Sequence, residues 1–414
     1  MSTSLRTTSS PPLLTLDEAL TRLLGALGPV GATETLSTFD ALGRVLAADV
    51  TSALDVPPAD NSSMDGYALR CADVAAPGGA LPVSQRIAAG VVGTALEPGT
   101  AARIFTGAQV PAGADAVVMQ EQCEAEGGTV RVNTVPAFGQ WIRRRGEDVR
   151  AGSVVLPAGT RLTPQALGLA AAVGAGSLQV APRPRVALFS TGDELAMPGE
   201  VLKPGAIYNS NRFTLRGLIE ALGCACDDLG IVPDKLDATR AALRRAAEGN
   251  DLIVTCGGVS VGEEDHLKPA VQAEGRLDLW SVAMKPGKPL AFGEVRRQDG
   301  SSAWFIGLPG NPVSSFLTFL LAVRPFLLRL QGATDTSPRA LGLRADFDWP
   351  RPDRRREFMR VRRNGQGGLD LFPNQSSGVL TSVVWADGIV DNPGGMAIRA
   401  GDTVAYLAFA ELLA

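Results

Sequence analysis

The segment that decides the fold is Asp251-Leu-Ile-Val-Thr-Cys-Gly-Gly-Val-Ser-Val-Gly-Glu-Glu-Asp265. Its apolar start, Leu252–Thr255, is too short for a helix and rich in β-branched residues, so it predicts a buried strand. Gly257 and Gly258 follow, which allows the backbone to turn sharply and to approach a ligand closely. A strand, a glycine loop and a helix start can together hold phosphate or another anion, with Ser260 as an extra donor.

Three acids, Glu263, Glu264 and Asp265, stand where the next helix is expected to begin. Carboxylates suit the positive end of a helix dipole, but they would repel an anion unless a cation lay between them. The segment therefore indicates a site for phosphate and a metal ion. The alternative is an ordinary glycine-rich turn between a strand and a helix, and this segment alone does not decide between the two.

Other predicted strands also end in acids. A strand expected over 185–190 runs into Ser190-Thr-Gly-Asp-Glu194, and Asp234 follows a strand expected near 229–232. Two helices are expected in this region, over 211–222 and 235–248. This alternation is typical of a doubly wound parallel sheet, in which ligands bind at the carboxyl ends of the strands. Glu194, Asp234 and Asp265 should therefore converge on one edge, which favours a functional site.

Two later loops fit the same edge. Met284-Lys-Pro-Gly-Lys-Pro289 sets Lys285 and Lys288 on one stiff turn, which predicts an oxyanion site, although most lysines are only surface charge. Leu308-Pro-Gly-Asn-Pro-Val-Ser-Ser315 leads into an apolar helix, with Asn311 at its cap, and its free amides could take a phosphate. A well-capped core helix explains that second loop equally well.

The first part of the chain predicts a small β domain inserted into a helical one. Thr15-Leu-Asp-Glu18 is a capping box that starts one helix, and a second is expected over 37–46. Short strands broken by Gly and Pro fill 81–155, and Thr163-Pro164 then starts another helix. Helices before and after the β segment indicate the insertion.

Three features of this part of the chain can have a binding role. The loop 60–68 carries two carboxylates and an aromatic residue, although loops this rich in turn formers are usually only turns. Thr106 stands beside a glycine at a strand end. Arg143–Arg145 is either a solvated charge run, the commoner case, or a clamp for an anion.

After Gly332 a linker runs to Pro338, and the remaining residues predict a small β barrel. The strands are expected over 341–347, 357–362, 369–372 and 403–409. The run 354–363 is strongly basic, and Asn374-Gln-Ser-Ser-Gly378 is a polar loop that could add hydrogen-bond donors.

Composition sets the frame for these predictions. A chain of 414 residues should contain several domains, and its net charge of −4 gives no indication of nucleic acid or membrane binding. His266 is the only histidine, so histidine-rich metal sites are excluded, and five cysteines without a CxxC pair argue against a disulfide framework or a zinc site. Residues 1–12 should form a disordered tail, and no apolar run has the length of a membrane span. We expect a cytoplasmic protein.

Seven motifs in order resemble the molybdopterin molybdenumtransferase (MoeA) family, which includes the gephyrin E domain. They are DNSSMDGYA (60–68), RIFTGAQVPAGADAVVMQE (103–121), IRRRGED (142–148), ALFSTGDEL (187–195), TCGGVSVGEED (255–265), MKPGKPLAF (284–292) and LPGNPVSS (308–315). The similarity begins near Leu13 and covers nearly the whole chain. Seven motifs with matching order and spacing are far more specific than any one of them.

The resemblance implies a multidomain α/β plus β fold. An elongated N-terminal domain (13–50 and 150–180) would carry an inserted small β domain (51–149). A doubly wound α/β domain (181–332) would resemble the molybdopterin adenylyltransferase fold, and a β barrel (333–414) would end the chain. The resemblance also implies a homodimer whose cleft is shared between subunits, and the adenylyltransferase as a partner.

The activity implied by the resemblance is the insertion of molybdate into adenylylated molybdopterin, with Mg²⁺ as cofactor and release of AMP. The acidic site residues of the family fall on Asp65, Glu194, Asp234 and Asp265, with Thr106 nearby. Mg²⁺ would be held by Asp265, Asp234 and Glu194, the oxyanion would be bound by Lys285, Lys288, Arg360 and the Ser376–Ser377 turn, and further contacts would come from Arg143, Gly257, Gly258, Ser260, Pro309 and Asn311.

The chain departs from the family pattern in two places. Ser281 stands where several relatives have a basic residue, so we expect weaker anion binding. The serine loop is only loosely similar, so the choice between Ser376 and Ser377 stays open. Three alternatives remain: a non-catalytic molybdopterin-binding scaffold, a tungstate-inserting paralogue, and adenylylation of the pterin itself. The site acids argue against a scaffold, because every acid of the motifs is present, and the surrounding domains argue against adenylylation.

Overall fold

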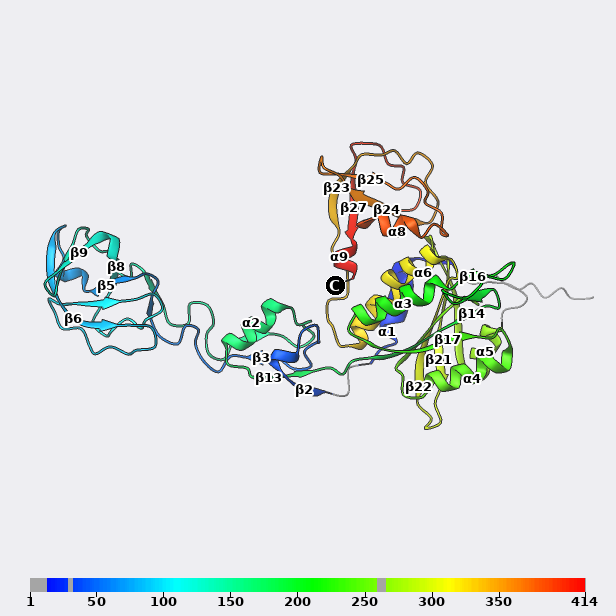
Figure 1. The fold of residues 1–414 in the computed structure, drawn as a ribbon, viewed down its shortest axis with the longest axis horizontal. Coiled ribbons are helices and arrows are strands. Elements are labelled where there is room, and N and C mark those ends of the chain that lie inside the picture. Colours follow the sequence, from blue (N-terminus) through cyan, green and yellow to red (C-terminus); the bar gives the residue numbers. More distant parts are fainter. Residues whose placement is uncertain (1–12, 29–32, 259–265, 414) are drawn as a thin grey trace, which may run out of the picture.

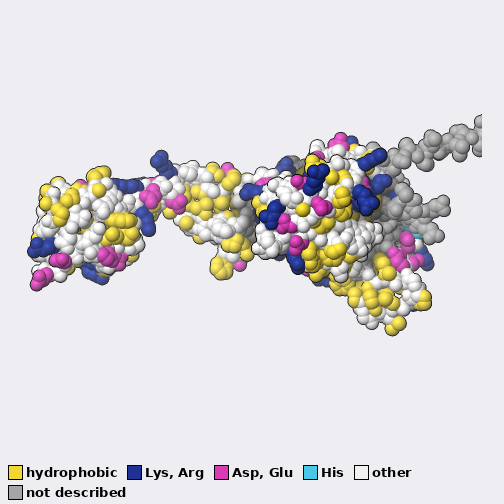
Figure 2. Space-filling model, turned by 90° about the horizontal axis from the view of Figure 1, so that it is seen from above, with side chains coloured by type: hydrophobic (Ala, Val, Ile, Leu, Met, Phe, Trp, Pro, Cys, Tyr) yellow, Lys and Arg dark blue, Asp and Glu magenta, His cyan; other side chains and the backbone are white. Residues whose placement is uncertain are grey.

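The computed structural model describes residues 13–28, 33–258 and 266–413, so the expected tail over 1–12 and the segment with Ser260 and Asp265 lie outside the described residues. The molecule is elongated (Figure 1). A β domain lies at one end, a small lobe with one helix lies in the middle, and the α/β domain and the C-terminal barrel lie together at the other end. On the face shown in Figure 2, acidic and basic side chains are interspersed, in line with the small net charge of −4.

The α/β domain is built on a seven-stranded sheet in the order β1-β19-β21-β22-β18-β14-β17. Its parallel part consists of β22 (Ser302–Leu308), β18 (Leu252–Cys256), β14 (Arg185–Thr191) and β17 (Ala225–Val232). β21 (Pro289–Arg296) and β19 (Gly275–Val282) extend it in antiparallel pairings, and β1 (Leu13–Leu14) is the edge strand. All five residues of β18 are buried, which explains the unbroken apolar run in the sequence.

Helices cover both faces of this sheet, as in the predicted doubly wound fold (Figure 1). α4 (Leu236–Ala247) and α5 (Leu267–Glu274) pack on one face through Leu243, Ala246 and Leu267. α3 (Ser210–Ala221), α6 (Pro312–Thr318) and α7 (Arg324–Leu330) pack on the other. A single π-helical turn, Phe319–Val323, joins α6 to α7.

We expected no apolar run of membrane-spanning length, but within the described part of the chain one continuous helical segment, Pro312–Leu330, has the length and hydropathy of a membrane span. However, 89% of it is buried inside the protein. Its apolar side chains, such as Leu317, Phe319 and Phe326, belong to the core of the α/β domain. The segment is therefore a core helix of this domain.

The first helix lies in a different domain from the one that we expected. The predicted capping box is present, since Glu18 N donates to Thr15 Oγ1 over 3.2 Å, and α1 spans Leu16–Gly25. Its apolar positions Leu16, Ala19 and Leu23 pack into the α/β core, not into an elongated N-terminal domain. The sequence shows the apolar stripe of the helix but not the surface on which that stripe packs. The chain path decides this surface, because β1, directly before α1, pairs with β19 of the α/β sheet.

The middle lobe has its own small core around α2 (Pro164–Ala172), where Thr163 caps the helix as predicted. The helix expected over 37–46 was wrong. Residues 34–37 form strand β2, paired with β13 (Ser177–Val180), and only one 3₁₀ turn follows, Thr38–Asp40. Two further short strands, β3 (Val50–Thr51) and β12 (Val154–Leu156), pair in this lobe. Pairing with a strand over a hundred residues away therefore outweighed local helical spacing.

The inserted β domain contains a six-stranded sheet in the order β8-β5-β7-β6-β10-β9. The bounds are β5 Gly66–Leu69, β6 Gly79–Ile87, β7 Ala101–Ile104, β8 Ala116–Met119, β9 Cys123–Glu126 and β10 Thr129–Val132. A separate two-stranded pair is formed by β4 (Asn61–Ser62), which precedes this sheet in the chain, and β11 (Ile142–Arg143), which follows it.

The C-terminal domain is the predicted β barrel. β24 (Arg356–Arg363), β25 (Gly368–Leu371), β23 (Leu341–Ala345), β27 (Thr403–Ala408) and β26 (Gly388–Asn392) follow one another, and β26 pairs back to β24 to close it. β26 and the short helices α8 (Thr381–Trp385) and α9 (Phe409–Leu412) were not predicted. A further strand, β20 (Met284–Lys285) of the α/β domain, adds to β24 in parallel and so connects the two domains.

Candidate functional site

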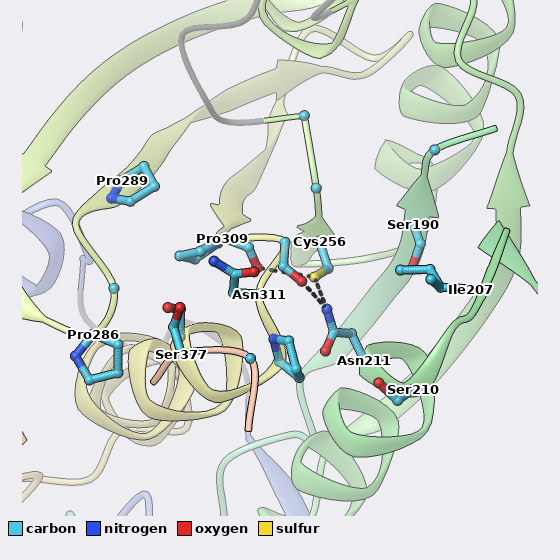
Figure 3. A pocket seen from close by; sticks show the side chains of 18 of the residues that line it. Ser190, Ile207, Ser210, Asn211, Cys256, Pro286, Pro289, Pro309, Asn311 and Ser377 are labelled. Atoms are coloured by element: carbon cyan, nitrogen blue, oxygen red, sulfur yellow. Dashed lines mark hydrogen bonds between the residues drawn. The ribbon is translucent and has the colours of Figure 1, made fainter. Parts of the chain in front are cut away.

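A cavity of about 980 Å³ lies at the carboxyl ends of β14 and β18, between the α/β domain and the barrel (Figure 3). Ligands bind at this edge in open parallel sheets. The lining residues come from the strand ends, the starts of α3 and α6, the turn after β20, and the barrel. They are Ser190–Gly192, Glu194, Leu195, 207–211, Asp234, 256–258, 285–289, 309–312, Ser314, Arg355 and 375–378.

The glycine loop after β18 turns sharply, as predicted, and it lies close to the end of β14. Gly257 and Gly258 have φ values of +96° and +65°, which side chains rarely adopt. A Cβ atom on Gly257 would lie 2.9 Å from the carbonyl oxygen of Thr191. The loop after β18 can therefore lie against the end of β14 only with glycine at this position.

Asn211 connects three of the segments that form the cavity wall. Its Nδ2 donates to the carbonyl oxygen of Gly310 over 2.7 Å and to Cys256 Sγ over 2.9 Å (Figure 3). The Cys256 thiol in turn donates to the carbonyl oxygen of Pro309 over 3.3 Å. Sequence reasoning missed Asn211, because an asparagine in the first turn of a helix is indistinguishable from an ordinary end-of-helix residue.

Two of the predicted metal ligands, Glu194 and Asp234, line the cavity from the loops after β14 and β17. The third, Asp265, lies outside the described residues, as does Ser260. Among the described residues no three His, Cys, Asp or Glu side chains form a metal-binding group. Two cavity carboxylates still fit Mg²⁺, which is commonly bound by one or two carboxylates together with substrate phosphates.

Lys285 and Lys288 both line the cavity, as the turn predicted. Lys285 is not a free cation, because its Nζ lies 3.2 Å from Glu357 Oε1 and 3.5 Å from Asp353 Oδ2. Lys288 is exposed. The turn is attached to the barrel, since Met284 and Lys285 pair with Arg356 and Glu357.

Arg355 lines the cavity and was not predicted, although it belongs to the basic run that the sequence displays. Its guanidinium forms a two-pronged ion pair with Asp353, at 3.0 Å to Oδ1 and 2.8 Å to Oδ2. The hydrogen bonds from Arg355 hold the pKa of the Asp353 carboxyl well below its usual range. Asp353 therefore stays ionised and fixes the arginine at the cavity rim.

Arg360 was expected to bind the oxyanion, but the structure places it under the cavity wall and not among the lining residues. Its side chain is 1% exposed and donates to the carbonyl oxygen of Ser376 and to Ser382 Oγ, both over 3.1 Å. Burial lowers the pKa of its guanidinium to about 10. The sequence could not reveal this, because residues 357–361 of β24 are all buried and show no inward–outward alternation from which the direction of Arg360 could be inferred.

The serine turn reaches the cavity from the barrel. Ser376 and Ser377 both line it, so the choice between them stays open. Val313 N donates to the carbonyl oxygen of Ser377 over 3.0 Å, which joins this turn to the start of α6. Pro309 and Asn311 also line the cavity, and Asn311 occupies the N-cap position of α6 without a capping hydrogen bond from its side chain.

Asp65, Thr106 and Arg143 do not reach this cavity. They belong to the inserted β domain, at the other end of the molecule (Figure 1). Asp65 Oδ1 accepts from Thr106 N and from Thr106 Oγ1, both over 2.8 Å, and these bonds lower the pKa of Asp65. The structure thus brings Asp65 and Thr106 together as a pair, but far from Glu194 and Asp234 within one chain.

Comparison with known protein families covers most of the chain. Residues 14–174 match the MoeA N-terminal region (domain I and II), residues 187–329 match a probable molybdopterin binding domain, and residues 343–409 match the MoeA C-terminal region (domain IV). The seven motifs of the sequence analysis lie in the first two of these segments, and the third contains the basic run 354–363 and the polar loop 374–378.

Full-length relatives agree with these matches. Molybdopterin molybdenumtransferase from Haemophilus influenzae is 38% identical, over 97% of this chain and 100% of the relative. Molybdopterin molybdenumtransferase 2 from Mycobacterium tuberculosis is 39% identical, over 87% of this chain and 90% of the relative. The crystal structure of the molybdopterin biosynthesis MoeA protein from Pyrococcus horikoshii OT3 superposes with a TM-score of 0.82 at 30% identity, over 96% of this chain and 100% of that one. The chain therefore belongs to the molybdopterin molybdenumtransferase family.

Proposed function

We propose that this chain is a transferase of molybdenum cofactor biosynthesis that inserts molybdate into adenylylated molybdopterin and releases AMP. The observation that carries the proposal is the mixed lining of one cavity. Glu194 and Asp234 supply carboxylates, whereas Lys285, Lys288 and Arg355 supply cations. A phosphoanhydride substrate held with Mg²⁺ needs the carboxylates, and an oxyanion substrate needs the cations.

Glu194 and Asp234 would hold Mg²⁺, together with Asp265 from the segment outside the described residues. When bound there, the ion would supply Lewis-acid polarisation of phosphate oxygens and would lower the pKa of a coordinated water. His266 is the only histidine of the chain, and this scheme assigns it no role as a general base.

The residues of the chain itself have two tasks in this reaction. Lys285, Lys288 and Arg355, with the serine turn, bind and orient the oxyanion at the barrel side of the cavity. The glycine loop after β18 exposes its backbone to the pterin phosphate, because no side chain intervenes. Holding both substrates in one cavity makes the transfer effectively intramolecular, and positioning of this kind can lower a reaction barrier by roughly 7–11 kcal/mol.

The assay that tests this proposal is AMP release by the purified protein with adenylylated molybdopterin, Mg²⁺ and either molybdate or tungstate. We expect AMP release with molybdate. Release only with tungstate would identify the tungstate-inserting paralogue. Tight pterin binding without AMP release would support the scaffold alternative, and consumption of ATP with unmodified molybdopterin would identify adenylylation as the activity.

We further propose that the active form is a cytoplasmic homodimer with a shared site, supplied with substrate by the adenylyltransferase. The separation of Asp65 and Thr106 from the cavity supports a shared site, because a second subunit can bring these residues to it. Asp65→Ala and Asp265→Ala chains should each be inactive alone. After mixed refolding, about half of the dimers are mixed and each has one intact site of two, so roughly a quarter of the activity should return under two-fold symmetry.

The outcome of this complementation test distinguishes two arrangements. Recovered activity supports a site built from both subunits. No recovery, with mixed dimers shown to form, would mean that each site is built within a single chain and that Asp65 acts elsewhere.

A further inference from the structure

A buried carboxylate beside the cavity belongs to Glu357, the second residue of β24 in the barrel. Its side chain is 2% exposed, and both of its oxygens accept hydrogen bonds. Oε2 accepts from Trp349 Nε1 over 2.8 Å and from Asp353 N over 3.1 Å, and Oε1 accepts from Lys285 Nζ over 3.2 Å. None of the motifs that indicated the site includes this residue.

The position of Glu357 is determined from both sides. Strand pairing sets Lys285 directly beside Glu357, since β20 and β24 are parallel with these two residues as partners. The two bonds to Oε2 prevent the carboxylate from turning away, and a buried ionised group must keep its partners to avoid a large desolvation cost. Lys285, in contrast, is 40% exposed and has a flexible four-carbon stem. The Glu357 carboxylate is therefore immobilised by its own hydrogen bonds, and it restrains the more mobile ammonium group of Lys285.

We propose that Glu357 is a positioning residue for the oxyanion site, acting through Lys285. Glu357 anchors the ammonium group of Lys285 at the cavity wall, so that the remaining N–H donors of Lys285 face the oxyanion. An unrestrained lysine would lose side-chain entropy on binding the anion, and Lys285 avoids much of this cost because it is already held in place. Asp353 acts in the same way on Arg355, which it grips by two bonds. The barrel thereby orients two cations that belong to different domains. This inference rests on the proposed function, because the oxyanion is its substrate.

The test is a double-mutant cycle on Lys285 and Glu357 in the full-length protein, with AMP release measured against molybdate concentration. Glu357→Gln keeps the shape of the side chain and removes the charge. We expect the KM for molybdate to rise about tenfold, which corresponds to about 1.4 kcal/mol, with the KM for adenylylated molybdopterin unchanged. In a Lys285→Met background the same change should have no further effect on the molybdate KM, because the residue acts only through the lysine.

Asp391→Asn is the matched control. Asp391 is another acid of the barrel and is half-buried. It forms a two-pronged ion pair with Arg356 at 2.6 Å, and it does not line the cavity. Its loss should leave the molybdate KM unchanged, and thermal unfolding of every variant verifies that the barrel is folded.

Three results would overturn the inference. An unchanged or lower molybdate KM in Glu357→Gln would show that the carboxylate does not position Lys285 or only competes with the anion. An equal rise in the Lys285→Met background would show that Glu357 acts through another group. Wild-type protein that releases no AMP with molybdate would overturn the proposed function, and this inference with it, whereas normal wild-type turnover restricts the failure to Glu357.

Discussion

The glycine loop after β18 permits a prediction whose magnitude follows from the structure. Gly257 has φ +96°, and a Cβ atom there would lie 2.9 Å from the carbonyl oxygen of Thr191. Positive φ costs an alanine roughly 1–2 kcal/mol relative to glycine. The contact with a backbone oxygen adds an overpacking cost of about 1–3 kcal/mol, because neither strand end can move freely. We therefore expect Gly257→Ala to destabilise the α/β domain by about 2–5 kcal/mol.

Gly249 provides a matched control within the same domain. It has φ +77°, is exposed, and a Cβ atom there would meet nothing within 4 Å. Gly249→Ala should therefore show only the conformational cost of roughly 1–2 kcal/mol. The difference between the two variants isolates the contact with Thr191.

Urea denaturation gives the free energy of unfolding of the α/β domain in the Gly257→Ala and Gly249→Ala variants. The rate of AMP release at different substrate concentrations gives the KM for adenylylated molybdopterin. We expect Gly257→Ala to raise that KM as well, because the loop after β18 must shift into the cavity. Equal stability and equal KM in the two variants would refute the reasoning, since they would show that the close approach of this loop to the end of β14 does not constrain the site.

Four further predictions follow from the contacts of the site. Replacing Glu194 by Gln, or Asp234 by Asn, should lower AMP release and raise the Mg²⁺ concentration needed for half-maximal rate, because a ligand charge is lost; an unchanged Mg²⁺ requirement would contradict the assignment. Replacing Lys285 and Lys288 together by Ala should raise the molybdate concentration for half-maximal rate and leave pterin affinity nearly unchanged, and a defect in pterin binding alone would assign these lysines to the phosphate. Thr106→Val should raise the pKa of Asp65, measured by NMR of its carboxyl carbon, because the hydroxyl donor to this carboxylate is lost. In the wild type, the two hydrogen bonds from Thr106 stabilise the folded state at a pH above the pKa of Asp65 in the unfolded chain. This stabilisation is lost as the pH falls through the lower pKa of Asp65 in the folded protein. Burial raises the pKa of the Cys224 thiol to about 12, so this thiol should not react with a disulfide reagent at pH 8 until the protein unfolds, and rapid labelling of the native protein would contradict its burial.

Local sequence determined much of this protein. The capping box at Thr15, the N-cap at Thr163 and a buried strand over Leu252–Thr255 were predicted, and all three are present, the strand with one further residue. Each depends on residues within a few positions of one another. The acids and glycines at strand ends predicted a site at one edge of a parallel sheet, and Glu194, Gly257 and other predicted residues line one cavity there. Geometry common to all such sheets made this possible.

Tertiary structure decided the partners of these elements. The helix expected over 37–46 gave way to a strand paired with Ser177–Val180, and α1 packs into the α/β core instead of a separate N-terminal domain. Neither result is encoded in local spacing, because an apolar stripe specifies burial but not the surface that buries it.

The same distinction applies within the site. Sequence identified Lys285 and Arg360 as cations, but only the folded chain sets Lys285 against the buried Glu357 and places Arg360 beneath the Ser376 turn. Arg355, whose side chain reaches the cavity, was one arginine in a basic run. Residue type determines charge, whereas the electrostatic role of a charge depends on its burial and its neighbours, and these come from segments far apart in the chain.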